Sequence, residues 1–231
     1  MGLLLNPFRA LVIGSSGAIG SAFMDLLQNN PLCSSVVGIH RHSDNPIDYQ
    51  HPDSIEACAA TLSAEAPFQL IINTIGLLHT SKWMPEKKLD DLNAEQMLEL
   101  MKINAMGPAL TIRHFSKLLD SKHSIMVTLS AKVGSIGDNR LGGWYSYRAS
   151  KAALNMVIKT ASIEWARTKP NAVLIAMHPG TVNSELSKPF RGEQIGRPAN
   201  EAATDMFRVI EQLKTEYSGS FLSYSGEKLP W

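Results

Sequence analysis

The segment Arg9-Ala10-Leu11-Val12-Ile13-Gly14-Ser15-Ser16-Gly17-Ala18-Ile19-Gly20 decides the fold of this 231-residue chain. Its first part, 9–13, is a short and mainly apolar run typical of a buried strand, and the glycines after it predict a tight turn. A helical pattern follows, with its apolar stripe at Ile19, Phe23, Leu26 and Leu27. Strand, glycine-rich turn and helix in this order are the context of a dinucleotide-binding site.

Glycines in such a turn let the backbone approach a pyrophosphate, and the start of the helix offers free N–H groups with a partial positive charge. The serine hydroxyls add hydrogen-bond donors. An ordinary glycine turn without a ligand is the alternative interpretation. We expect these residues to contact a cofactor: Gly14, Ser15, Ser16, Gly17, Ala18 and Ile19.

The end of the second expected strand, 35–40, bears on the identity of that cofactor. Sites that prefer NAD place an acidic residue about 20 residues after the glycines, where it binds the ribose hydroxyl. Here that place carries His40, Arg41 and His42, and the first carboxylate is Asp44. Because an arginine suits a 2′-phosphate, we predict NADP(H) rather than NAD(H), with Arg41 as the main contact. A solvated loop arginine is the alternative.

The remaining pattern alternates between strands and helices. Further strands are expected at 68–73, 124–129, 172–177 and 220–223, and helices at 52–64, 93–119, 144–167 and 201–214. Few residues separate the second strand from an extended stretch at 47–49, so the usual crossover helix is expected to be absent or replaced by a loop. The alternation predicts an α/β fold, a single doubly wound Rossmann domain over 1–231 with a mainly parallel sheet flanked by helices.

Two further segments are unusual. Pro108 lies inside the expected helix 93–119 and should kink it or loosen a turn, close after Asn104. Asn104 could then be a residue beside freed backbone groups that bind a water, a helix cap or a satisfied core amide. The segment 183–198 is polar and contains several prolines and glycines, which indicates a mobile lid over the substrate.

The start of the expected helix 144–167 carries Tyr147 and Lys151, four residues apart and so on one helix face. A free tyrosine has a pKa of about 10, too high to exchange protons readily at neutral pH. A nearby ammonium should lower that pKa, and a tyrosine tuned in this way can act as a general acid or base. Tyr145 is the internal comparison, because the residue four positions after it is Ala149. By itself the Tyr-x-x-x-Lys pair is more often a solvated helix face.

Composition limits the other function classes. The chain is 44% hydrophobic and 19% charged with a formal net charge of +1, which does not suggest nucleic-acid or membrane binding. Cys33 and Cys58 are its two cysteines, too few for a disulfide framework or a structural zinc site. The apolar run Leu3-Leu4-Leu5 is too short for a signal peptide or a membrane span, so we expect a cytoplasmic protein without a metal.

The chemistry-bearing positions occur in a fixed order, namely Gly14–Gly20, Asp48, Asn73-Thr74-Ile75-Gly76, Asn104, Ser130, Tyr147-x-x-x-Lys151 and Pro179-Gly180-Thr181-Val182. As an ordered set over nearly the whole chain they resemble the short-chain dehydrogenase/reductase family. The stretches 134–145 and 178–182 and the closing Leu229-Pro230-Trp231 are most similar to its bacterial C-factor-like group, and the sniffer-type carbonyl reductases are similar too.

This resemblance implies a role for each position. Tyr147 would be the general acid/base, Lys151 would lower its pKa and bind the nicotinamide ribose, and Ser130 would hold the substrate oxygen. Asn104 would anchor a water that links Lys151 to solvent. The other expected cofactor contacts are Asp48 at the adenine, the backbone at Asn73 and Gly76, and Pro179, Gly180, Thr181 and Val182 near the nicotinamide.

Three departures from the family pattern matter. Ile13 and Ala18 stand where the family has threonine and glycine, and the family's Asn-Asn-Ala-Gly becomes Asn73-Thr74-Ile75-Gly76. The serine also stands farther from the tyrosine than is usual, 17 residues away if it is Ser130. Ser135 is nearer in sequence, but Ser130 ends a strand and is therefore our choice.

The resulting prediction is an NADP(H)-dependent oxidoreductase that reduces a ketone or aldehyde, or oxidises the corresponding alcohol, by hydride transfer. The alternative is a non-catalytic NADP(H)-binding signalling or redox-sensing protein of C-factor type. A nucleotide-sugar epimerase or dehydratase shares the two motifs but usually carries a larger C-terminal domain than this chain offers. The resemblance further implies a small-molecule partner and a homodimer or homotetramer built through the helices 93–119 and 144–167. Trp83, Trp144 and the expected lid suggest a partly apolar substrate.

Overall fold

A six-stranded sheet, parallel throughout, forms the centre of the molecule in the computed structural model, which describes Leu4 and residues 7–231. Most of the apolar run at 3–5 therefore lies outside the described residues. The strands are β1 (Phe8–Ile13), β2 (Cys33–Ile39), β3 (Leu70–Asn73), β4 (Ser124–Leu129), β5 (Ala172–His178) and β6 (Phe221–Ser223). Their order is β2-β1-β3-β4-β5-β6, so the chain changes direction across the sheet between β1 and β3, where open α/β sheets bind ligands.

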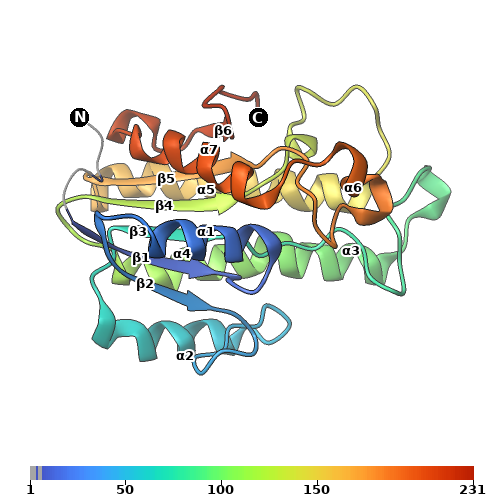
Figure 1. Cartoon of the computed structure of the whole chain (residues 1–231). Coiled ribbons are helices and arrows are strands. Elements are labelled where there is room, and N and C mark those ends of the chain that lie inside the picture. The colour runs from blue at the N-terminus through green and yellow to red at the C-terminus, as the bar shows by residue number, and fades with distance from the viewer. Residues whose placement is uncertain (1–3, 5–6) are drawn as a thin grey trace.

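Helices cover both faces of this sheet (Figure 1). They are α1 (Ala18–Gln28), α2 (Asp53–Thr61), α3 (Ala94–Met101), α4 (Gly107–Phe115), α5 (Tyr145–Thr168), α6 (Gly192–Ile195) and α7 (Ala199–Glu211). Side chains of α1 and α7 pack with alternate strand residues such as Val12 in one buried cluster. Side chains of α2, α4 and α5 pack with the intervening residues, such as Leu11, in the other. The doubly wound architecture predicted from the alternation is thus confirmed.

Two segments follow the unusual features of the sequence. No helix lies between β2 and the stretch 47–49, as expected, but 47–49 does not join the sheet. Ile47 and Tyr49 are nevertheless buried and pack in the core. The crossover helix from β2 to the next strand, β3, is α2. The helix expected over 93–119 is divided by a π-helical turn at Lys102–Met106, directly before α4. Pro108 has no N–H, so a carbonyl oxygen of this turn lacks its helical partner, and the turn loosens as expected.

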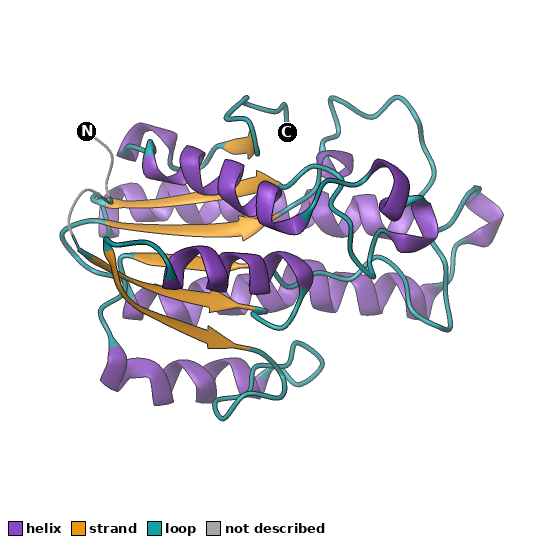
Figure 2. Cartoon of the chain, in the orientation of Figure 1, coloured by secondary structure: helices purple, strands orange, loops and turns teal. Residues whose placement is uncertain are grey.

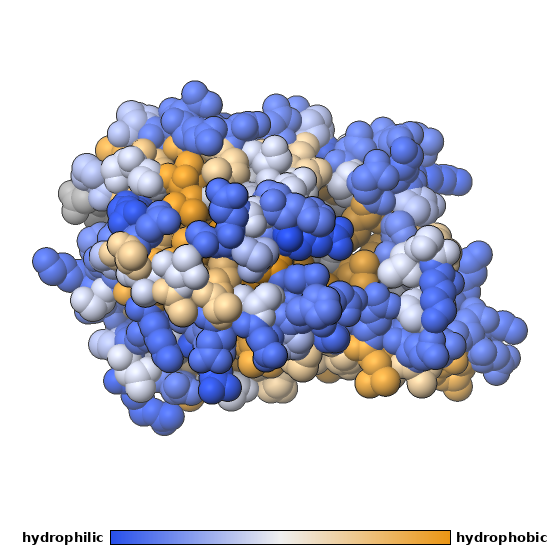
Figure 3. Space-filling view, turned by 90° about the horizontal axis from the view of Figure 1, so that it is seen from below, coloured by the Kyte–Doolittle hydropathy of each residue, from blue (hydrophilic) through white to orange (hydrophobic). Residues whose placement is uncertain are grey.

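All strand arrows point to one end of the molecule, where the long connections gather (Figure 2). The register of β1 places Ile13 beside Ile39 on one side and Asn73 on the other, which brings the residues after three strands together. The segment 183–198 lies at this end and contains a 3₁₀ turn and α6. Seen from below, hydrophilic residues cover most of the surface, and hydrophobic residues show as small separate patches (Figure 3).

Candidate active site

Two cavities lie side by side at the carboxyl ends of the strands. The larger has a volume of about 560 Å³ and the smaller of about 390 Å³. Thr74, Ile75 and Gly76, the residues after β3, line both. Together the two cavities make an extended site that crosses the change of direction between β1 and β3, the place and shape that a dinucleotide requires.

The glycine turn joins β1 to α1 in the way the sequence predicts. Gly14 has φ of +86°, and a Cβ built there would lie 2.6 Å from Thr74 Oγ1. A Cβ on Gly20 would lie 2.1 Å from the carbonyl oxygen of Gly14, so only glycine allows the turn to pack on the helix. No side chain caps the first turn of α1, so its N–H groups are free to bind an anion. The first turn also carries no acidic side chain that would repel one.

The smaller cavity holds the residues that the sequence assigns to the adenosine end. Gly14, Ser16 and Gly17 line it on one side, and Arg41 and Asp48 on the other. Arg41 is exposed, and no ion pair or hydrogen bond engages its guanidinium within the described part of the chain. The Asp48 carboxylate accepts a hydrogen bond of 2.9 Å from the Gln50 N–H. An exposed cation and a carboxylate held by a hydrogen bond therefore line this end of the site.

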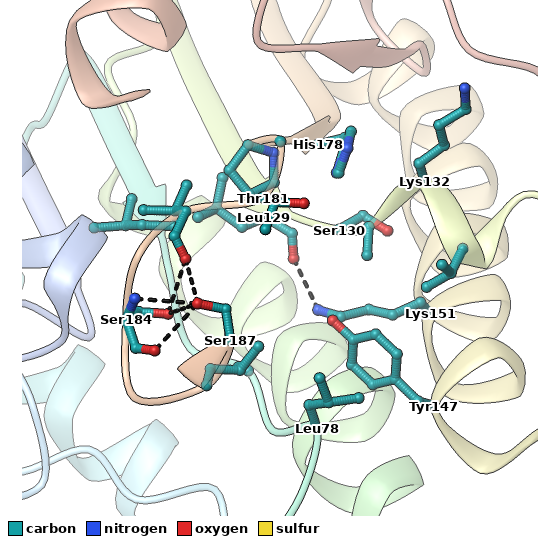
Figure 4. A pocket seen from close by; sticks show the side chains of 18 of the residues that line it. Leu78, Leu129, Ser130, Lys132, Tyr147, Lys151, His178, Thr181, Ser184 and Ser187 are labelled. Carbon is teal, nitrogen blue, oxygen red and sulfur yellow. Dashed lines mark hydrogen bonds between the residues drawn. The ribbon is translucent and has the colours of Figure 1, made fainter. Parts of the chain in front are cut away.

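Tyr147 and Lys151 project from the first two turns of α5 into the larger cavity (Figure 4). The Lys151 Nζ lies 5.9 Å from the centre of the Tyr147 ring and donates a 3.0 Å hydrogen bond to the carbonyl oxygen of Leu129. Both side chains are buried. The predicted placement on one helix face is confirmed.

The electrostatics of this pair correct one expectation. The Tyr-x-x-x-Lys spacing predicts that Lys151 lowers the pKa of Tyr147, but burial raises that pKa above its usual value. Burial also lowers the pKa of Lys151 to about 8, because the charged form loses hydration. In this cavity the phenol therefore stays protonated at neutral pH, and desolvation outweighs the attraction of the ammonium.

Asn104 lies in the π-helical turn and is fully buried. Its Oδ1 accepts from the Leu77 N–H at 2.8 Å, and its Nδ2 donates to the Leu77 carbonyl at 2.7 Å and to Ser150 Oγ at 3.0 Å. The side chain is thus a satisfied core amide, one of the possibilities left open by the sequence. A Cβ built on Gly76 would lie 3.5 Å from Lys151 Nζ and 3.6 Å from Asn104 Oδ1, so Asn104 and Lys151 approach the same point.

The two candidate serines occupy different places. Ser130 lines the larger cavity opposite Tyr147, and its hydroxyl donates a 2.7 Å hydrogen bond to Asn155 Oδ1. Ser135 does not line the cavity, and its hydroxyl donates to the carbonyl oxygen of Trp231 at 3.3 Å. The structure therefore brings Ser130, and not Ser135, to Tyr147.

The remaining predicted residues divide into two groups. Ile19 and the whole run Pro179, Gly180, Thr181 and Val182 line the larger cavity. Ser15, Ala18 and Asn73 line neither cavity. The Asn73 side chain donates a 2.9 Å hydrogen bond to the Tyr49 hydroxyl, so it supports the strand end from within the core.

His178 and Lys132, which are not among the predicted site residues, also line the larger cavity. Burial and the nearby Lys132 lower the pKa of His178 to about 4, so the imidazole is neutral at pH 7. The position of His178 directly before the Pro179–Val182 run was the available signal. No group of His, Cys, Asp and Glu side chains among residues 4 and 7–231 could hold a metal ion. Over the same residues, no helix is long and apolar enough to cross a membrane.

Comparison with known proteins agrees with this geometry. The short-chain dehydrogenase/reductase family model described as enoyl-(acyl carrier protein) reductase matches residues 34–224. The chain belongs to the short-chain dehydrogenase/reductase family. It is 33% identical to a 1-hydroxy-2-glutathionyl-2-methyl-3-butene dehydrogenase of Rhodococcus sp. (strain AD45) over 80% of this chain and 78% of the relative. It is 32% identical to the C-signal protein of Myxococcus xanthus over 74% of this chain and 98% of the relative.

Solved structures of the short-chain dehydrogenase/reductase fold superpose on nearly all of the chain. The carbonyl reductase Sniffer of D. melanogaster has a TM-score of 0.83 at 18% identity and covers 98% of this chain and 100% of its own. An NADPH-bound carbonyl reductase from chicken fatty liver has a TM-score of 0.81 at 24% identity, with coverage of 98% and 100%. At these identities the likeness establishes the fold. Both levels of the predicted resemblance, the family and its sniffer-type and C-factor-like groups, are confirmed.

Proposed function

We propose that the chain is an NADP(H)-dependent oxidoreductase that reduces a ketone or aldehyde, or oxidises the corresponding alcohol, with Tyr147 as the general acid/base. The observation that carries this proposal is the position of Tyr147, Lys151 and Ser130 in one cavity. That cavity shares the residues after β3 with the cavity of Arg41. A nicotinamide cofactor that spans both would supply or accept the hydride at the larger one.

The residues present fit such a cofactor. The free N–H groups at the start of α1 would hold the pyrophosphate, because the glycines allow close approach and no carboxylate opposes it. Arg41 would bind a 2′-phosphate, and Asp48 would bind the adenine amino group. The run Pro179–Val182 would fix the nicotinamide end. The NADPH and NADP bound by two solved relatives of the same fold support this choice.

The chain's own side chains supply the acid–base chemistry. Tyr147 would give its hydroxyl proton to the substrate oxygen during reduction, and its raised pKa keeps that proton in place until then. Ser130, whose hydroxyl hydrogen points to Asn155 Oδ1, would turn that hydrogen to the substrate oxygen while negative charge develops there. Lys151 would return a proton to Tyr147, and a water bound at the π-helical turn of Asn104 would link Lys151 to solvent.

The segment 183–198 would act as a lid within the single domain. Leu186, Phe190 and Ile195 from this segment line the larger cavity beside Leu78 and Trp144. They form an apolar wall opposite the polar strand ends. A lid of this kind would exclude water from the reacting atoms and select a partly apolar substrate.

Ser130→Ala is expected to lower kcat/KM about a hundredfold, because one donor to the developing oxyanion is lost. Ser135→Ala is the matched control, and we expect it to leave kcat/KM unchanged, since its hydroxyl faces Trp231. Steady-state kinetics with the best carbonyl substrate measure both. Loss of activity in the Ser135 variant with full activity in the Ser130 variant would reverse the assignment.

Arg41→Ala is expected to weaken NADPH binding about tenfold or more, because the 2′-phosphate of the cofactor loses its charged partner. NADH affinity should not change, because NADH lacks that phosphate. Fluorescence titration of the reduced cofactors measures both affinities, with Arg167→Ala at the far end of α5 as the control. Equal weakening for the two cofactors would show that Arg41 does not bind the 2′-phosphate.

A homodimer would cover exposed apolar residues on α3 and α5. Leu98 is 69% exposed, and Met156 and Ile163, seven residues apart on one stripe of α5, are 66% and 52% exposed. We expect Met156→Glu to give a monomer by size-exclusion chromatography with light scattering. The control is Leu32→Glu, an exposed apolar position directly before β2, which should leave the measured mass unchanged. A wild-type protein that already elutes as a monomer would refute the dimer.

The proposed activity is tested by following NADPH oxidation at 340 nm with a panel of aliphatic and aryl ketones and aldehydes. The panel includes an enoyl thioester, because the matching family model carries that description. Turnover of a carbonyl compound supports the proposal. Turnover of the enoyl thioester alone would show that the protein reduces a carbon–carbon double bond and not a carbonyl group.

A non-catalytic signalling role is the second candidate, and the likeness to the C-signal protein over nearly all of that relative favours it. The Tyr147 hydroxyl beside Ser130 in the same cavity favours catalysis instead, because a protein that only binds the cofactor needs no acid–base group there. Tight NADPH binding without turnover of any compound in the panel would favour the signalling role.

A further inference from the structure

The backbone of Trp144 adopts a conformation that large side chains rarely adopt. Its φ is 53° and its ψ 41°, in the left-handed region, directly before the first turn of α5. Gly142 and Gly143 precede it with φ of 64° and 63°, and a third glycine would continue this path at no steric cost. A tryptophan here stores backbone strain, and such strain gathers at functional sites.

The indole of Trp144 forms part of the wall of the larger cavity. Its ring centre lies 4.9 Å from that of Phe190, with the planes inclined by 58°, and 6.1 Å from that of Tyr147. The residue after Phe190, Arg191, is the other non-glycine residue with a positive φ in the part of the chain that the structure describes. One strained position therefore carries the ring that contacts Tyr147, and the other directly follows the ring that contacts Trp144.

Glu86, from the connection between β3 and α3, binds the backbone around Trp144. The Trp144 N–H donates a 2.6 Å hydrogen bond to the Glu86 carbonyl oxygen. The Glu86 carboxylate accepts from the Ser146 hydroxyl and, at 3.3 Å, from the Ser146 N–H. The side chain is only 2% exposed. Its charge faces the start of α5, where the helix dipole favours an anion.

Arg148 holds the same turn from the other side. Its Nε donates to the Gly143 carbonyl oxygen at 2.9 Å, and its Nη1 donates to that of Val133, a cavity residue, at 3.2 Å. The glycines are thus held by α5 itself. Trp144 and Ser146 depend on Glu86, which lies 60 residues away from Ser146 in sequence.

We propose that Glu86 is a positioning residue of the active site. Its carboxylate fixes Ser146, and its backbone carbonyl accepts from the Trp144 N–H. By anchoring Ser146 at the start of α5, the carboxylate keeps Trp144 in the left-handed conformation and so sets the indole as the wall against which the apolar group of the substrate lies. The part of this inference that concerns the substrate rests on the proposed reductase function. The part that concerns the position of the indole does not.

The position of the indole is tested by ¹⁹F NMR of protein labelled with 5-fluorotryptophan. The chain has four tryptophans, and Trp144→Phe assigns the Trp144 signal. We expect Glu86→Ala to shift or broaden that signal and to leave the signal of Trp165, buried farther along α5, in place. Glu86→Gln keeps an oxygen that can accept from Ser146, so its Trp144 signal should remain near that of the wild type.

The matched control is Glu95→Ala, which removes an exposed carboxylate that pairs with Lys82 on the surface of α3. It should leave the Trp144 and Trp165 signals in place, whereas the Trp83 signal can respond because Lys82 lies 4.4 Å from the centre of the Trp83 ring. Coincident Trp144 signals in wild type and Glu86→Ala would overturn the proposal. If Glu86→Ala does not fold, Ser146→Ala removes the hydroxyl partner and keeps the carboxylate. An unchanged Trp144 signal there overturns the proposal, and a displaced one supports it.

Kinetics test the consequence for the substrate. Glu86→Ala and Trp144→Ala should each raise KM for an aryl ketone about tenfold and change kcat little, because an aromatic contact to the bound apolar group is lost. KM for a small aliphatic aldehyde should change far less, and the double variant should add nothing. A fall in kcat with both substrates would indicate a merely structural role and overturn the proposal. If the wild type reduces no carbonyl compound, the reductase function fails, and the ¹⁹F result still decides the role of Glu86.

Discussion

Tyr147→Phe is expected to lower kcat about a thousandfold and to leave NADPH affinity and the melting temperature nearly unchanged. The variant keeps the ring that packs beside Trp144 and removes the hydroxyl that would carry the proton. No hydrogen bond within the described part of the chain depends on that hydroxyl, so the fold should tolerate the change. NADPH oxidation in the presence of the best carbonyl substrate measures kcat.

Tyr145→Phe is the matched control for this experiment. Tyr145 stands at the first residue of α5, and the position four residues later is Ala149 rather than a lysine. Removal of its hydroxyl should therefore leave kcat unchanged. A Tyr147→Phe protein that turns over as fast as the wild type would contradict the proposed general acid.

Lys151→Met is expected to lower kcat about a hundredfold and at the same time to stabilise the protein without cofactor. Lys151 is 3% exposed, and burial lowers its pKa from 10.5 to about 8. This difference corresponds to a cost of about 3 kcal/mol for the buried ammonium at neutral pH. Methionine has a similar length and no charge, but it leaves the Leu129 carbonyl without its donor, which costs about 1–2 kcal/mol. We expect a net gain of about 1–2 kcal/mol.

The pH dependence of this gain has a definite sign. Between pH 8 and 10.5 the unfolded chain holds the Lys151 proton and the folded protein has released it, so stability of the wild type rises with pH through this group. The advantage of the methionine variant is therefore largest below pH 8 and shrinks as the pH rises. Urea unfolding of both proteins at pH 7 and pH 9.5 measures the difference. A difference that is constant with pH would contradict the buried ammonium.

Much of the fold was accessible from the sequence because it depends on local patterns. The strand 124–129 was predicted with the bounds of β4, and the helix predicted over 144–167 differs from α5 by one residue at each end. Both segments have strong composition signals, an apolar run in one and helix-forming residues in the other. The placement of Tyr147 and Lys151 on one face followed from helix geometry alone.

The electrostatics of the site could not be predicted in the same way. Spacing shows that Lys151 lies near Tyr147, but the sign of the pKa shift of Tyr147 depends on how many atoms exclude water from the cavity. The partners of Asn104 come from Leu77 and Ser150, far away in sequence, and no pattern indicates them. The same holds for Asn155, which fixes Ser130, and for Glu86, which reaches α5 from a loop.

The measurement that tests the central claim most directly is calorimetric titration of the purified protein with NADPH, and with NADH for comparison. We predict one NADPH site per chain and an affinity for NADPH about tenfold or more above that for NADH, because Arg41 meets the 2′-phosphate. A preference for NADH would be compatible with the proposed oxidoreductase activity but would show that Arg41 does not bind a 2′-phosphate. Binding of neither cofactor would contradict the proposed oxidoreductase, because the glycine turn and the catalytic cavity would then have no hydride source to bring together.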